Sequence, residues 1–185
     1  QWTKNKQMKL NTKKSCAILF NFTEKYQFTS RLVIEGAPLK IVDETKLLGL
    51  ILTSDLKWSK NTGSLIKRAN ARMELLRRLS SFSVPVKDMV HVYILYIRSI
   101  LEQSSVIWHS TLTEENKADL ERVQKNALRN ILRENYTTYE EALLKLNLQT
   151  LEERRKILSL KFAKKCLSND KFKDLFPRNE TTGVE

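Results

Sequence analysis

Hydrophobic and polar positions follow two different periods along this chain. Up to residue 56, apolar residues form short runs bounded by polar or turn residues, a pattern typical of β-strands. The runs cover residues 17–20, 32–34, 39–42 and 47–52. A turn signal at residues 35–38 predicts a hairpin between the second and third runs. Trp2, Met8 and Leu10, set among lysines, predict the end of a basic amphipathic helix ahead of these strands.

From residue 57 onward the apolar spacing becomes helical. It predicts helices over residues 59–79, 85–101 and 114–131, a short one after Thr138 and a longer one from Thr150 to about Leu167. Thr138 with Glu141, and Thr150 with Glu153, match the capping-box spacing. Apolar residues cover more than half the circle of helix 85–101, so we expect it to be the most buried helix.

These patterns predict an α+β fold, in which a small antiparallel β region with one helix is followed by an all-α helical bundle. The expected divisions are residues 1–56 for the β region and residues 57–177 for the helical domain. Residues 178–185 are polar and are expected to form a disordered tail.

The net charge of the chain indicates what kind of partner it binds. The chain holds 33 Lys and Arg against 21 Asp and Glu, a net charge of +12, which favours a polyanionic partner. Residues 57–100 hold nine basic and two acidic side chains, whereas residues 101–185 hold 15 and 14. Cys16 and Cys166 fit neither a disulfide framework nor a zinc site, which favours an intracellular setting, nuclear or cytoplasmic. The apolar run 89–101 is too short to span a membrane, so no membrane partner is expected.

The helix predicted over residues 59–79 separates apolar from basic side chains. Leu65, Ile66, Ala69, Met73 and Leu76 lie on one face, and Lys60, Lys67 and Arg78 point the other way. Lysine and arginine neutralise backbone phosphates, and an aromatic ring can stack on bases. The candidate nucleic-acid-binding residues are Lys60, Lys67, Arg68, Arg72 and Trp58. Two plainer interpretations stay open, namely that Trp58 fills the core and that the basic face is only solvated.

No catalytic or metal-ligating pattern is apparent. The carboxylate pairs 114–115, 140–141 and 152–153 each fall in the first turn of a predicted helix, where they favour the helix dipole. His91 and His109 have no ligand at metal-binding spacing, and the four glycines form no phosphate loop. We therefore assign no metal-binding residue.

Five blocks of the sequence together resemble a known family. They are WTKNKQMKLNTKKS, KLLGLILTSDLKW, YIRSILEQSSVIWHS, LERVQKNALRNIL and LQTLEERRKILSLKF. In this order and spacing they resemble the carboxyl-terminal part of the reverse transcriptase of jockey-like non-LTR retrotransposons. The resemblance covers Trp2 to about Pro177 and implies a palm edge followed by a thumb. It also implies that the chain begins just after the strand with the paired catalytic aspartates.

The resemblance implies roles for particular residues. The element from Asn11 to Ser15 maps Lys14 onto a lysine proposed to protonate the leaving pyrophosphate. Leu48 and Gly49 correspond to the turn that supports the primer end. Asn61 and Gln103 depart from the family, which often has histidine and tyrosine there.

No pair of metal-binding aspartates of the F/Y-A-D-D type occurs in these 185 residues. Two-metal phosphoryl transfer needs such carboxylates to hold Mg²⁺, which is implied for the intact polymerase. We therefore expect a fragment that uses no cofactor, is inactive alone and contributes binding of an RNA–DNA or DNA duplex. Its other expected partner is the missing amino-terminal polymerase part, with which it could regain activity. The alternative from a different class is a helical protein–protein interaction module without a nucleic-acid role.

Overall fold

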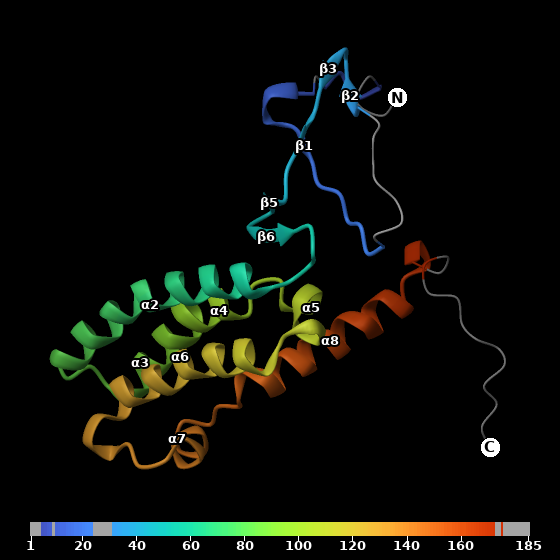
Figure 1. Cartoon of the computed structure of the whole chain (residues 1–185). Helices are drawn as coiled ribbons and strands as arrows, with labels where there is room; N and C mark the ends of the chain where they lie inside the picture. Colours follow the sequence, from blue (N-terminus) through green and yellow to red (C-terminus); the bar gives the residue numbers. More distant parts are fainter. Residues whose placement is uncertain (1–4, 9, 24–30, 173–174, 176–185) are drawn as a thin grey trace, which may run out of the picture. The chain divides into compact units, whose positions relative to one another are not determined.

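The chain divides into two compact units, Gln1–Gly63 and Ser64–Glu185. The computed structural model describes residues 5–8, 10–23, 31–172 and 175 (Figure 1). The boundary between the units lies inside helix α2, Ser59–Ser81, and not at residue 56 as the sequence pattern predicts. Short sheets in the first unit and a helical bundle in the second confirm the α+β class. Of the predicted opening helix, residues 2–4 and 9 lie outside the described residues, and Gln7 has φ of 52°, so the helix does not continue to Leu10. All of the tail 178–185 lies outside the described residues.

In the described part of the first unit, short strands pair two by two. They are β1 Cys16–Ala17, β2 Val33–Ile34, β3 Ala37–Pro38, β4 Lys40–Ile41, β5 Glu44–Leu47 and β6 Leu50–Thr53, preceded by the 3₁₀ turn η1 Thr12–Lys14. The pairs β2–β3 and β5–β6 are antiparallel, whereas β1 and β4 pair in parallel. The expectation of a purely antiparallel region therefore missed one pair. The predicted buried strand 17–20 is also wrong, since β1 ends at Ala17 and Phe20 is 44% exposed.

Two hairpin turns have the same backbone form. Glu35 and Gly36 have φ of 50° and 81°, and Leu48 and Gly49 have φ of 48° and 89°. Positive φ at both central residues is what a type I′ turn requires, and this turn matches the twist of the paired strands. The turn predicted at residues 35–38 is confirmed. The single strand predicted over residues 47–52 is wrong, because Leu48 and Gly49 divide it into the ends of β5 and β6.

The second unit is helical. After α2 come α3 Val86–Val92, the π-helical segment η2 Tyr93–Arg98, α4 Ser99–Leu101, α5 Ser105–Trp108, η3 His109–Thr111, α6 Glu114–Leu132, η4 Arg133–Asn135, α7 Tyr139–Lys145, α8 Leu151–Leu167 and η5 Asp170–Phe172. Threonine starts three of these helices. The hydroxyls of Thr113, Thr138 and Thr150 each accept a bond from a first-turn amide. The capping box of Thr150 and Glu153 has both of its hydrogen bonds. In the predicted box of Thr138 and Glu141, the Glu141 carboxylate instead accepts a bond from the Thr137 hydroxyl.

The core of the second unit lies between α2, α6 and the helix 86–101. On α2, four of the five residues of the predicted apolar face are buried, since Leu65, Ala69, Met73 and Leu76 are at most 2% exposed, whereas Ile66 is half-buried. Helix 86–101 is only half buried, because Leu95 is 66% and Tyr96 48% exposed. The prediction that it is the most buried helix is therefore wrong. Apolar residues around most of its circumference do not all find a partner in the fold.

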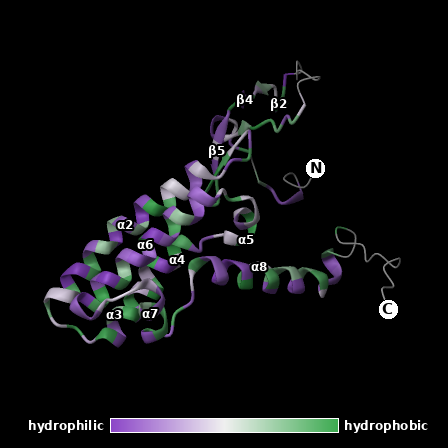
Figure 2. Cartoon of the chain, turned by 60° about the horizontal axis from the view of Figure 1, so that its bottom comes forward, coloured by the Kyte–Doolittle hydropathy of each residue, from purple (hydrophilic) through white to green (hydrophobic). Residues whose placement is uncertain are grey.

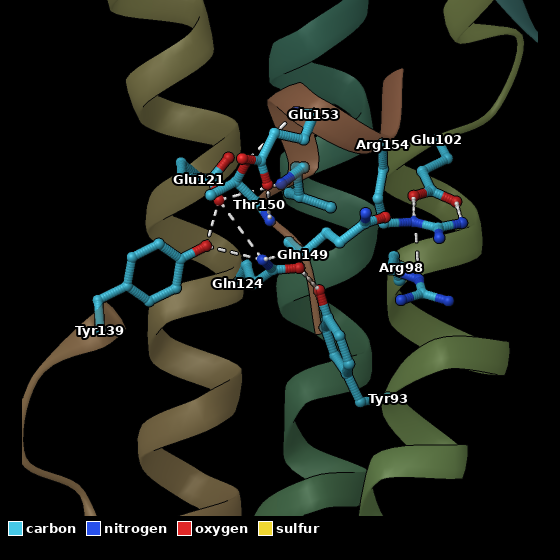
Figure 3. A network of polar contacts seen from close by, with 11 residues as sticks. Tyr93, Arg98, Glu102, Glu121, Gln124, Tyr139, Gln149, Thr150, Glu153 and Arg154 are labelled. Atoms are coloured by element: carbon cyan, nitrogen blue, oxygen red, sulfur yellow. Dashed lines mark hydrogen bonds and ion pairs between the residues drawn. The ribbon is translucent and has the colours of Figure 1, made fainter. Parts of the chain in front are cut away.

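A polar network joins four segments inside this core (Figure 3). Gln124 of α6 is fully buried, and its amide oxygen accepts a bond from the Tyr93 hydroxyl. Its amide nitrogen donates to the Tyr139 hydroxyl at 2.7 Å and to the Gln149 carbonyl at 3.0 Å. Tyr139 in turn donates to Glu121. Burial raises the pKa of both tyrosines, so the hydroxyls stay protonated and act as donors.

Two neighbouring arginines at the start of α8 have contrasting surroundings. Arg154 forms a two-pronged ion pair with Glu102, which Arg98 also approaches at 3.9 Å. Arg155 is fully buried, and its Nε donates to Nδ1 of His109 at 3.4 Å. Burial lowers the pKa of His109, which keeps Nδ1 free to accept. Among the described residues, the terminal nitrogens of Arg155 have no hydrogen-bond partner.

These surroundings predict opposite responses to the same change. Arg154→Met leaves the largely buried Glu102 carboxylate with only the distant Arg98, and we expect it to cost about 2 kcal/mol of unfolding free energy. Arg155→Met keeps the packed stem and removes a desolvated charge, so its cost should be below about 1 kcal/mol or a gain. Urea unfolding of both variants measures the difference. A larger loss for Arg155→Met would contradict this assignment.

Candidate nucleic-acid interface

The part of α2 in the second unit is strongly basic, and its charged side chains are exposed to solvent. Residues 64–81 hold five basic side chains and one acidic one. Lys67, Arg68 and Arg72 are all exposed. Arg68 and Arg72 are four residues apart and so share a face, whereas Lys67 lies about 100° from Arg68 around the helix. The structure thus exposes three of the five sequence-predicted binding residues on α2, and two of them share a face.

These three cations differ from the others of α2 in their partners. Arg77 and Arg78 both bind Glu74, at 3.1 and 3.2 Å, and this lowers the pKa of that carboxyl. Arg68 donates to the side-chain oxygen of Gln103 at 3.0 Å, a neutral acceptor that leaves the arginine charge uncompensated. Within the part of the chain that the structure describes, Lys67 and Arg72 form no ion pair or hydrogen bond.

The basic side chains of α6 are mostly occupied by neighbours. Lys117 pairs with Glu114 at 2.7 Å, Arg122 pairs with Asp119 at 2.9 Å, and Lys125 and Arg129 lie over the rings of Tyr139 and Tyr136 at 4.9 and 5.3 Å. An anion approaching α6 would compete with these contacts. Uncompensated positive charge is therefore better presented by α2 than by α6.

Trp58 and Lys60 belong to the first unit and have local partners. Trp58 is 8% exposed, and this burial supports the packing interpretation that the sequence left open. Lys60 donates to Glu44 of β5, which raises the pKa of the Lys60 ammonium. A phosphate would have to compete with that carboxylate. Neither residue therefore offers the free ring or free charge that its place in the sequence suggested.

Asn61 has a structural role that sequence reasoning missed. Its side chain is buried, and its Oδ1 accepts a bond from the backbone N–H of Ile51 at 3.1 Å. The bond fastens strand β6 to the first turn of α2. Only its departure from the family pattern marked this position, and that gave no hint of a strand contact.

Lys14 lies at the end of a well-defined turn. The Asn11 side chain accepts a bond from the Lys14 backbone N–H at 3.2 Å, and the Ser15 hydroxyl donates to the Asn11 carbonyl at 2.9 Å. Such side-chain bonds to nearby backbone are typical of asparagine and serine in turns. They fix the backbone that presents the exposed Lys14 side chain. Any role in protonating pyrophosphate depends on catalytic carboxylates that this sequence lacks.

Leu48 and Gly49 occupy the tip of the β5–β6 hairpin. The Leu48 side chain is 91% exposed, although exposing an apolar side chain to water does not stabilise the fold. Its positive φ is unfavourable for a residue with a β-carbon, whereas Gly49 tolerates it freely. The hairpin thus presents an apolar side chain at a strained position, which is compatible with a contact to another molecule.

Other classes of site find no support in the described residues. No three His, Cys, Asp or Glu side chains there are grouped so that they could hold a metal ion. None of the helices described is both long and apolar enough to cross a membrane. Comparison of the chain with protein-family models, with curated proteins and with solved structures gives no match.

Replacing Leu48 tests the strain at the hairpin tip. Leu48→Asn creates an Asn-Gly type I′ turn and should stabilise the hairpin by about 0.5–1 kcal/mol, because asparagine adopts positive φ at lower cost. Slower hydrogen exchange of the β5 and β6 amides would report the gain. Leu47→Asn is the matched control, since Leu47 faces Leu50 across the strands and its loss should speed exchange. Faster exchange in Leu48→Asn would show that the leucine side chain stabilises the turn.

Proposed function

We propose that the exposed face of α2 binds the phosphate backbone of a nucleic-acid duplex. The observation that carries the proposal is that Lys67, Arg68 and Arg72 of α2 are exposed and have no carboxylate partner among the described residues. Cations of this kind displace condensed counterions from a duplex, which supplies affinity without sequence preference. The two arginines add planar donors suited to phosphate oxygens.

The sequence resemblance extends this proposal to a parent activity. We infer that the chain is the palm edge and thumb of a reverse transcriptase, and that the duplex it holds is an RNA–DNA hybrid or its DNA product. Support comes from the five ordered sequence blocks and from the basic face on the first helix of the thumb-like region. Synthesis would need the aspartate pair and its Mg²⁺, so the chain alone should bind without polymerising.

Binding to a labelled RNA–DNA hybrid and to a DNA duplex, measured by fluorescence anisotropy across salt concentrations, tests the proposal. The logarithm of the binding constant should fall with the logarithm of salt concentration, with a slope of about −3 for three phosphate contacts. Changing Lys67 and Arg68 together to alanine should reduce that slope by about 2, equally for all sequences.

Arg77→Ala with Arg78→Ala is the matched control. It removes the same charge from adjacent positions of the same helix, but these arginines already share Glu74. Its effect on the slope should be clearly smaller, and circular dichroism should show that both variants keep their helices. Equal reductions of the slope in the two double variants would mean that binding depends only on net charge and not on these positions. Affinity independent of salt, or a sequence preference lost in the first variant, would contradict backbone binding.

A further inference from the structure

Helix α8 is apolar on two opposite faces. On one face, Leu151 and Arg155 are fully buried and Cys166 is 7% exposed, although Phe162 on the same face is 52% exposed. On the other side, Ile157, Leu160 and Leu167 are 37, 63 and 52% exposed. The outer face of a surface helix is normally polar. The second half of α8 lies apart from the other helices of its unit in both views (Figures 1 and 2), and its outer-face residues Leu160 and Leu167 are exposed.

The outer face has the spacing of a helix-pairing seam. Glu153, Ile157, Leu160, Lys164 and Leu167 follow one another at intervals of four, three, four and three residues. This is the heptad spacing with which one helix packs along another. Along the seam, Glu153 precedes and Lys164 follows the central pair Ile157 and Leu160, so the pair has opposite charges at its two ends.

The amino-terminal end of this seam opens into a groove between α7 and α8. The groove has a volume of about 730 Å³ and includes Leu143, Leu144, Leu148 and Ile157 in its lining. Leu144 is 82% exposed, so this groove is also an apolar surface without cover among the described residues. A second helix lying along the seam could place an apolar side chain here.

We propose that α8 pairs antiparallel with α8 of a second copy of this chain. The seam is complementary to itself when one copy is reversed. The midpoint between Glu153 and Lys164 is also the midpoint between Ile157 and Leu160, so one two-fold axis serves both pairs. An antiparallel partner then sets Glu153 against Lys164 of the second copy and Ile157 against its Leu160, each pair occurring twice. Leu167 of the second copy comes opposite Thr150, at the groove that Leu144 and Leu148 line.

Other occupants fit this seam less well. A phosphate backbone would satisfy Lys164 but would leave Ile157 and Leu160 uncovered and would meet the Glu153 carboxylate. An acidic amphipathic helix would match Lys164 but not Glu153. A helix with both charges in reversed order complements the four central seam positions, and α8 itself is such a helix. The inference uses residues other than the basic face of α2 and does not depend on duplex binding.

Analytical ultracentrifugation across a range of protein concentrations tests the pairing. A single helix pair makes a small interface, so we expect a dimer with a dissociation constant on the order of 10–100 μM. Lys164→Glu places like charges against Glu153 at both ends and should weaken the dimer at least tenfold. Lys165→Glu is the matched control, because it makes the same charge change one residue away, off the seam, and should leave the dimer intact.

Cysteine cross-linking tests the direction of pairing. In a Cys16→Ser background, which removes the exposed native thiol, Ile157→Cys and Leu160→Cys proteins should form disulfides with each other more readily than with themselves. Parallel pairing would instead link each variant to itself. That result, a monomer at all concentrations, or equal losses in Lys164→Glu and Lys165→Glu would overturn the proposal. Weaker duplex binding in both of those variants without any dimer would assign the lysines to nucleic acid.

Discussion

The bundle depends on the buried amide of Gln124. Its two ends are satisfied by partners from separate segments: Tyr93 on the π-helical segment, Tyr139 on α7 and the Gln149 carbonyl ahead of α8. A buried polar group left without a partner costs about 1–3 kcal/mol, so no segment can move away without that penalty. Apolar packing alone would tolerate sliding of one helix against another. The network fixes which turns of the helices meet.

This inner polar network contrasts with the charges on the surface. Inside, Gln124 and the two tyrosines use their polar atoms on one another. Outside, α2 presents Lys67, Arg68 and Arg72 toward solvent while its apolar face is closed against the core. The packed apolar face fixes the position of the helix, and the long lysine and arginine side chains can adjust to the ligand that they contact. The two surfaces proposed to bind partners, on α2 and α8, are thus carried by one bundle.

Local patterns predicted the helices but not the contacts between distant segments. The 3.6-residue period located the apolar face of α2, and threonine spacing located the start of α8. Gln124 was missed because a polar residue inside an apolar stripe has no partner visible in its own helix. The pairing of Lys60 with Glu44 depends on β5 lying beside the start of α2, which residue spacing does not encode. The residue pattern placed a strand across Leu48, and only the family resemblance implied a turn there, because leucine rarely adopts positive φ.

The π-helical segment gives its helix one extra residue. A π turn holds one more residue than an α turn between hydrogen-bonded positions, so η2 contains a local excess of chain. Tyr93 at its start reaches Gln124, and Arg98 at its end approaches Glu102. Removing one residue from η2 would restore regular α geometry and leave the residues beyond it facing nearly the same way, because the π turn takes up the extra residue. The bulge therefore places an additional residue between Tyr93 and Arg98 without turning the end of the helix away from its partners.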